Sequence, residues 1–251
     1  RDLFPQGLAA VHKQLLAQRG GDPIWFKAHN GEWSSSPYRN DSRFAPSNYC
    51  AEGGCVGETG AWLPQGPDLW RHLFDTQWGL TEIKQDHMNE QLEMKACTTT
   101  VNVGRDWLKG MGDAATELGF HVSYCMTQPR IVMNSVTVPA AMHARATPDY
   151  IPHSNEHQWA LGGSAVFVWG AGLLPYKDTW QTTSYRAQNK RSGVRGDPAH
   201  KIAPSILLDV SEEAPLLHAL ASILSGAPVA FGDCMRAPTN VSILSVLSRQ
   251  D

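Results

Sequence analysis

Two acidic residues stand where apolar segments of this 251-residue chain end, each close to a cation. In the first segment, Ile83 leads into Lys84, Gln85 and Asp86. Alternate side chains of a strand share a face, so we expect Lys84 and Asp86 on the same side. A neighbouring cation keeps a carboxylate ionised, and an ionised, positioned carboxylate can act as a covalent nucleophile. A purely structural ion pair at the end of a strand would give the same pattern.

The second segment carries Arg145 and, four residues later, Asp149. A carboxylic acid here could protonate a leaving oxygen and then deprotonate water, while Arg145 could hold a substrate hydroxyl. The alternative is that Asp149 caps a helix beginning near Ile151. Retaining glycosidases use two carboxyl groups about 5–5.5 Å apart. If both segments end at one barrel mouth, Asp86 and Asp149 could form such a pair.

The rest of the chain alternates between strand and helix patterns. Short apolar runs predict strands at residues 23–29, 80–86, 120–126, 141–147, 173–176 and 227–233. Periodic apolar runs predict helices at residues 7–18, 68–78, 103–118, 130–136, 157–171 and 212–224. The helix at residues 157–171 is apolar nearly all round, so we expect it to be buried. The alternation is typical of parallel βαβ units.

The predicted fold class is therefore α/β, as either a doubly wound sheet or a (β/α)8 TIM-type barrel. No Gly-rich phosphate fingerprint follows any predicted strand, so a dinucleotide-binding sheet has no support. Polar residues gather where the predicted strands end. In a barrel those ends line one mouth, where chemistry takes place, so we favour the barrel.

Three segments of the sequence resemble segments of one enzyme family. Asp68 to Asn89 (DLWRHLFDTQWGLTEIKQDHMN) resembles the helix, W-G turn and K-x-D strand of the α-galactosidase (melibiase) and raffinose-synthase-like clan of retaining glycosidases. Arg145 to Asp149 resembles the R-x-x-x-D segment of that clan, and Asp86 and Asp149 stand 63 positions apart, a separation of the size the clan uses. Glu212 to Asp233 resembles its penultimate helix and last strand.

The resemblance implies a retaining α-glycosidase with Asp86 as nucleophile and Asp149 as acid/base, while Lys84 and Arg145 hold sugar hydroxyls. It also implies eight strands. Only about six, the third to the eighth, are visible, so we expect residues 1–251 to form a glycosidase-like barrel that lacks its first two strands and any flanking domains. The remainder of the polypeptide would then be a partner segment or chain. The alternative is a non-catalytic carbohydrate-binding or structural barrel. It is motivated by His87, where the clan often has Asn, and by the first predicted strand, which ends in His29 and Asn30 rather than in a sugar-binding carboxylate.

Other side chains near the predicted strand ends could bind a sugar. Indole faces stack on the C–H surface of a sugar, and Trp33 and Trp180 fall in loops that follow strands. His29, His87 and Asp178 are the polar candidates. The ten histidines include no H-E-x-x-H pattern, so we expect neither a metal nor another cofactor.

Composition limits the partners. The net charge is −3, and the basic face that nucleic-acid binding needs is not indicated. Apolar residues make up 42% of the chain, but no run of 18 apolar residues occurs, so we expect no membrane span. The expected partner is a carbohydrate substrate or glycan.

Cysteines and glycosylation patterns bear on the compartment. Of the five cysteines, Cys50 and Cys55 flank a Gly-rich turn and could close a small disulfide loop or remain free thiols. Asn40 and Asn240 match the glycosylation acceptor pattern. Together these features favour a secreted protein or one of an endomembrane, lysosome-like compartment.

Overall fold

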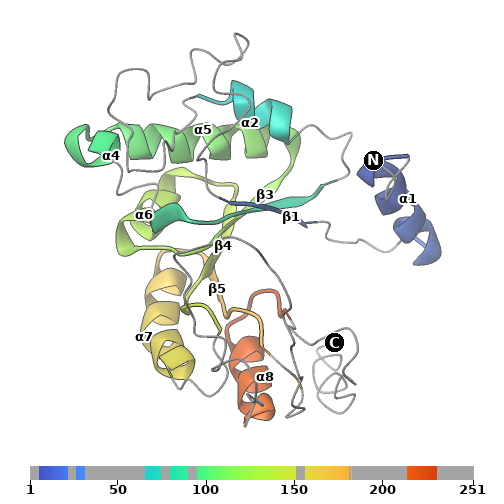
Figure 1. Cartoon of the computed structure of the whole chain (residues 1–251), viewed down its shortest axis with the longest axis vertical. Coiled ribbons are helices and arrows are strands. Elements are labelled where there is room, and N and C mark those ends of the chain that lie inside the picture. The colour runs from blue at the N-terminus through green and yellow to red at the C-terminus, as the bar shows by residue number, and fades with distance from the viewer. Residues whose placement is uncertain are drawn as a thin grey trace, which may run out of the picture. The chain divides into compact units, whose positions relative to one another are not determined.

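A computed structural model describes residues 6–21, 27–31, 66–74, 80–89, 95–150, 156–180, 182 and 214–230 (Figure 1). The chain divides into two compact units. The first unit comprises Arg1–Arg145 with Val168–Leu173, and the second comprises Ala146–Phe167 with Leu174–Asp251. Each unit is described by itself below.

A five-stranded sheet follows the order of the chain, β1-β2-β3-β4-β5. Its strands are β1 (Lys27–Asn30), β2 (Glu82–Gln85), β3 (His121–Tyr124), β4 (Ala141–Arg145) and β5 (Leu174–Tyr176). The pairs β1–β2, β2–β3 and β3–β4 are parallel, which requires crossover connections. The predicted α/β class is confirmed, and closure into an eight-stranded barrel stays a prediction. The strand predicted at residues 227–233 is absent over residues 227–230, and the rest of it lies outside the described residues.

Helices occupy most of the positions that apolar periodicity predicts. They are α1 (Leu8–Gln18), α2 (Asp68–Leu73), α4 (Lys95–Thr99), α5 (Val103–Leu118), α6 (Pro129–Asn134), α7 (Glu156–Gly170) and α8 (Pro215–Leu224), with a short 3-10 turn at Ser135–Thr137. The predicted limits of α5 are confirmed at both ends. It ends because Gly119 adopts a left-handed conformation (φ 74°), which costs glycine little. The short helix α4 was not predicted.

The core of the first unit lies between the sheet and the pair α2 and α5. Trp70 of α2 is fully buried, and its ring centroid lies 5.5 Å from Phe74 and 6.5 Å from Trp107 of α5. Phe74 also stacks on Phe120, which precedes β3. Such pairs add about 0.5–1.5 kcal/mol each beyond the apolar area they bury, so this aromatic cluster fixes the two helices against the sheet.

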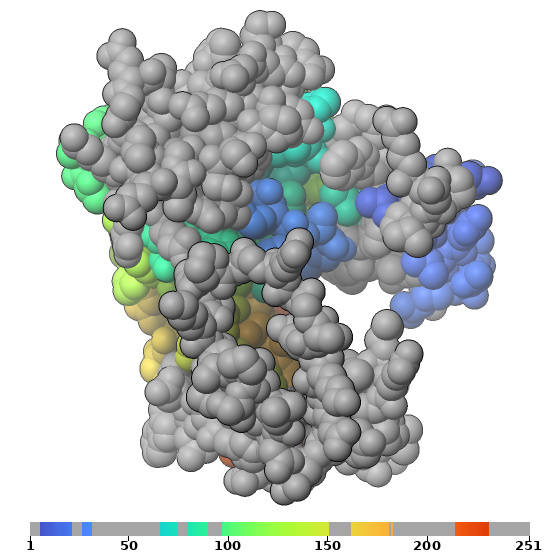
Figure 2. Space-filling model, viewed as in Figure 1, coloured from blue at the N-terminus to red at the C-terminus, as the bar shows by residue number. Residues whose placement is uncertain are grey.

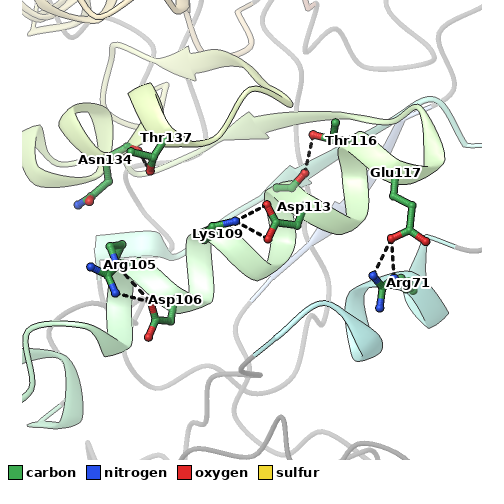
Figure 3. Close-up of polar contacts among 10 residues, drawn as sticks. Arg71, Arg105, Asp106, Lys109, Asp113, Thr116, Glu117, Asn134 and Thr137 are labelled. Atoms are coloured by element: carbon green, nitrogen blue, oxygen red, sulfur yellow. Dashed lines mark hydrogen bonds and ion pairs between the residues drawn. The ribbon is translucent and has the colours of Figure 1, made fainter.

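The outer face of α5 carries exposed ion pairs (Figure 3). Lys109 Nζ lies 2.6 Å from an Asp113 oxygen, and Arg71 of α2 lies 2.7 Å from Glu117. Exposed pairs of this kind are worth about 0.2–1 kcal/mol, so the buried aromatic rings dominate this contact.

The expectation that helix α7 is buried was wrong. Val166 and Trp169 are 69% and 71% exposed, and Phe167 is 40% exposed, while Val168 is buried. A helix that is apolar on all sides has no distinct apolar face. Its sequence pattern therefore does not indicate which side packs against other elements. Among the described residues, no helix has the length and apolarity needed to cross a membrane.

Candidate active site

One face of strands β1 to β4 is polar. The parallel register aligns His29 with Lys84, Lys84 with Ser123, and Ser123 with His143. Because side chains alternate, the same face also carries Lys27, Glu82, Asp86, Cys125 and Arg145. The opposite face places Ile83, Val122, Tyr124 and Ala144 in the hydrophobic core. Parallel sheets are usually apolar on both faces, so this buried polar face is where a functional site is expected.

Asp86 occupies the carboxyl end of this face, directly after β2. His29 Nε2 lies 2.7 Å from Asp86 Oδ2, and the backbone N–H of His87 donates to Asp86 Oδ1 at 2.8 Å. The Cys125 thiol, directly after β3, also hydrogen-bonds to this carboxylate. The Asp86 side chain keeps 15% of its surface exposed, so it can still meet a substrate. Neighbouring strand ends therefore orient the carboxylate without closing it off.

The electrostatics keep Asp86 ionised. Burial raises its pKa, but the hydrogen bonds from Cys125, His29 and His87, with the charge of Lys84, outweigh burial, and the pKa lies well below the ordinary value of 3.8. The Lys-x-Asp pattern predicts this ionisation, and Lys84 is one of several causes of it. For Cys125, burial is the main cause that raises the pKa, to about 11, with the Asp86 contact adding to it. The thiol therefore stays protonated and donates to Asp86.

Two non-glycine residues beside these side chains have left-handed backbones. His87, after Asp86, has φ 52°, and Met126, after Cys125, has φ 53°. This conformation is uncommon for residues with a Cβ and costs about 1 kcal/mol or more. Such strain occurs more often at functional sites than elsewhere, and here it recurs at equivalent positions after two adjacent strands.

The turns that follow β1 and β2 are held together by Gln85, which is fully buried. Its side-chain amide donates to the carbonyl oxygens of Gly31 and Asp86, at 3.2 and 2.8 Å, and accepts from Asn30 Nδ2 at 2.6 Å. The backbone of Asp86 also donates to Asn30 O. These bonds make the backbone that carries Asp86 rigid, which favours a precise geometry at the site.

A second charged group lies on the same face, at the amino end of β2. Glu82 is 2% exposed, and its Oε1 lies 2.6 Å from Lys27 Nζ and 3.4 Å from His143 Nδ1. Burial raises the pKa of Glu82, but the bonds from His143 and Lys27 outweigh it, and the net pKa is lowered. This buried carboxylate is therefore paired with one basic side chain from β1 and one from β4. Sequence reasoning did not single out Glu82.

Arg145 and His29, two of the predicted sugar-binding residues, both belong to the first unit. Arg145 ends β4, is buried, and lowers the pKa of the Cys125 thiol through its charge. Its carbonyl oxygen accepts from Thr127 Oγ1 at 3.0 Å, which ties it to the turn after β3. His29, predicted as a sugar-binding residue, instead holds the nucleophile candidate, although about half of its side chain remains exposed. Strand β1 is an edge strand of the described sheet. Figure 2 shows blue atoms of the N-terminal segments at the surface in this view.

Asp149 belongs to the second unit, in the segment that follows β4. It is exposed, whereas Thr147 is buried and Tyr150 is half-buried. The Tyr150 N–H donates to Asp178 Oδ2 at 2.7 Å. Asp178, predicted to bind substrate, thus holds the segment that carries Asp149.

The expectation that Trp180 contacts a sugar does not fit the structure. Its side chain is 0% exposed and forms a small core with Ala219 of α8, while its ring stacks on His218 at a centroid distance of 6.1 Å. A ring with no exposed surface has no face to offer to a ligand. The position of Trp180 in a loop was a poor guide, because large aromatic residues are mostly buried even between elements.

Several predicted residues lie outside the described part of the chain: Trp33, Cys50, Cys55, Asn40 and Asn240. Cys97 and Cys125 are described and are free thiols. Within the described ranges, no group of three or more His, Cys, Asp or Glu side chains is arranged to hold a metal ion.

Cys125 and Lys177 are the residues that sequence reasoning missed at these strand ends. Cys125 follows β3 at the position that Asp86 occupies after β2. Lys177 follows β5, is 3% exposed, and lies with its Nζ 5.1 Å from the Tyr150 ring. Alignment of the predicted strand ends could have indicated both.

Comparison with protein-family models, with curated proteins and with solved structures gave no match to this chain.

Proposed function

We propose that this chain is a retaining α-glycosidase-like enzyme that works by double displacement on a carbohydrate substrate. Asp86 attacks the anomeric carbon and forms a glycosyl ester, while Asp149 gives its proton to the leaving oxygen and the glycosidic C–O bond breaks. Water then adds to the anomeric carbon as Asp149 takes its proton, and the bond to Asp86 breaks. The sugar leaves with its original anomeric configuration.

The single observation that carries this proposal is the state of Asp86. Its carboxylate is ionised, held by His29, Cys125 and the His87 backbone, and still partly exposed at the carboxyl end of a parallel sheet. A group with a lowered pKa cannot deliver a proton near neutral pH, so it is suited to be a nucleophile and not a general acid. The carboxyl ends of parallel strands are also where α/β enzymes carry their chemistry.

The two aspartates have environments that suit different roles. Asp86 is surrounded by donors that stabilise its charged form, as a nucleophile requires. Asp149 is exposed on an anchored segment, where water and a leaving group can reach it. Two carboxyl groups with contrasting environments are the usual basis for separating nucleophile from acid/base.

The test is replacement of Asp86 by Asn, which keeps the size and removes the charge. We expect wild type to hydrolyse at least one member of a panel of aryl glycosides and Asp86→Asn to lose turnover on it. Asp113→Asn, which breaks only an exposed pair with Lys109, is the matched control and should retain activity. Circular dichroism and thermal unfolding check that both variants are folded.

Two results would contradict the proposal. Full activity of Asp86→Asn would show that Asp86 is not the nucleophile. A wild type that binds glycans but turns over none would favour a carbohydrate-binding barrel, the class suggested by the departures at His29 and His87.

A further inference from the structure

We infer that Asp178 is a positioning residue for Asp149, because it hydrogen-bonds to Thr147 and to Tyr150, on either side of Asp149. This inference rests on the proposed function, in which Asp149 is the acid/base. It concerns only the second unit and adds a role for a residue that does not itself contact the reacting atoms.

Three hydrogen bonds join the segment after β4 to the segment that ends β5. The Ala146 N–H donates to Tyr176 O at 2.9 Å. The Asp178 N–H donates to Thr147 Oγ1 at 3.0 Å, and the Tyr150 N–H donates to Asp178 Oδ2 at 2.7 Å. Asp178 thus uses its backbone on one side of Asp149 and its carboxylate on the other.

Tyr150 is held through its ring as well as through its backbone N–H. Its ring meets His218 of α8 edge-on at a centroid distance of 5.6 Å, and His218 stacks on the buried Trp180. The Lys177 ammonium lies 5.1 Å from the Tyr150 ring, within range of a cation–π contact. The residue that follows Asp149 is therefore held on its ring and on its N–H.

These anchors leave Asp149 exposed on a short, restrained bridge. Thr147 is 6% exposed, and Pro148 has its φ angle fixed by its ring. A general acid must lie within about 2.6–3.2 Å of the oxygen that it protonates, and a misplacement of about 1 Å can cost about 10²-fold in rate. Holding both neighbours keeps the carboxyl group placed without burying it.

The experiment separates positioning of the acid from general stability by varying the leaving group. An activated leaving group such as 2,4-dinitrophenolate departs without a proton, whereas an alkyl or unsubstituted phenyl leaving group needs one. We expect Asp178→Ala to lower kcat/KM for the poor leaving groups by about 10–100-fold and for the dinitrophenyl glycoside by less than about 3-fold. Asp178→Asn keeps an acceptor for the Tyr150 N–H and should restore most of the loss.

A second variant keeps the inference testable if Asp178→Ala fails to fold. Thr147→Val has nearly the same shape and removes only the acceptor of the Asp178 N–H. It should lower kcat/KM for the poor leaving groups by about 3–10-fold, a smaller loss with the same dependence on the leaving group. Asp113→Asn serves again as the surface control and should show no such dependence.

The outcomes distinguish the inference from the proposed function. Asp149→Ala is the reference, and it should show the strongest dependence on the leaving group. If Asp149→Ala shows none, the proposed function is wrong. If Asp149→Ala shows it, while Asp178→Ala and Thr147→Val lower all substrates equally or not at all, the proposed function stands and Asp178 is not a positioning residue.

Discussion

The Cys125 thiol is one of four groups that lower the pKa of the Asp86 carboxyl group. Burial of that carboxylate acts against ionisation, and the thiol is the largest of the contacts that overcome it, ahead of His29 and the His87 backbone. A thiol is a weak donor in general, but here its own pKa of about 11 keeps the proton available over the whole physiological range. At neutral pH the thiol is therefore the donor and the carboxylate the acceptor.

Replacement of Cys125 by Ala should move the acid limb of the pH profile upward. Without the thiol, the pKa of Asp86 rises towards its ordinary value of 3.8, so kcat/KM starts to fall at a higher pH than in wild type. The rate near neutral pH should change little. The measurement is kcat/KM against pH for an activated aryl glycoside.

The matched control is Cys97→Ala, since Cys97 is also a free, partly buried thiol with a raised pKa but does not contact Asp86. An identical acid limb in Cys125→Ala and Cys97→Ala would contradict the assigned contact. The same shift applies to stability. The lowered pKa stabilises the folded state above the ordinary value, and this contribution is lost as pH falls through the folded pKa. In Cys125→Ala this contribution should be smaller, and its loss should be complete at a higher pH.

For individual residues, local sequence patterns predicted part of the candidate site. Lys-x-Asp is readable because alternation along one strand is a property of the sequence itself. The contacts of Asp86 with His29 and Cys125 cross between strands separated by tens of residues, and they depend on register. Sequence alone leaves that register open, so neither contact was predicted.

Among the elements, helix α5 shows why a glycine can be required inside a helix. A Cβ on Gly110 would lie 2.7 Å from the carbonyl oxygen of Gly66, just before α2. Real Cβ atoms do not approach a backbone oxygen so closely, and a backbone oxygen cannot turn away as a flexible side chain can. The close contact of α2 with α5, and hence the aromatic core beneath the sheet, requires glycine there.

Gly110→Ala should therefore destabilise the protein by about 1–3 kcal/mol, the cost of overpacking. Gly163→Ala in α7 is the matched control, because a Cβ there meets nothing within 4 Å. It should stabilise the protein by about 0.5–1 kcal/mol through the better helix propensity of alanine. Urea unfolding measures both. Changes of the same sign in the two variants would contradict the packing.

Element prediction succeeded where the sequence carries its own stop signals. Helix α5 has an apolar stripe ended by Gly119, and both limits were found. Element prediction failed where burial or strand formation depends on contacts with other parts of the chain. α7 is apolar but exposed at Val166 and Trp169, and residues 227–230 are apolar but form no strand. Hydrophobicity predicts a tendency to be buried, and only the packing partners determine whether it is realised.

Across the whole molecule, the proposed mechanism draws one carboxyl group from each unit. Asp86 belongs to the first unit and Asp149 to the second. A retaining reaction requires about 5–5.5 Å between the two groups, whereas an inverting one requires about 6.5–9.5 Å to admit a water molecule. The stereochemistry of the product therefore distinguishes the proposed retaining mechanism from an inverting one.

We expect retention. Proton NMR of the first product formed from an α-glycoside should show the α-anomer before mutarotation, in wild type and in the Asp113→Asn control. Initial release of the β-anomer would mean inversion, and Asp86 would then be a base acting on water.

Covalent trapping of the nucleophile is the most direct test of the central claim that Asp86 attacks the sugar. Wild type is incubated with a panel of cyclophellitol-type epoxides that covers the common hexose configurations, digested with trypsin and analysed by tandem mass spectrometry. We predict one adduct on Asp86, a cyclitol ester formed by opening of the epoxide, within the tryptic peptide at residues 85–95, and none in Asp86→Asn. An adduct on another carboxylate, or no adduct from an epoxide whose parent glycoside the enzyme hydrolyses, would contradict the account.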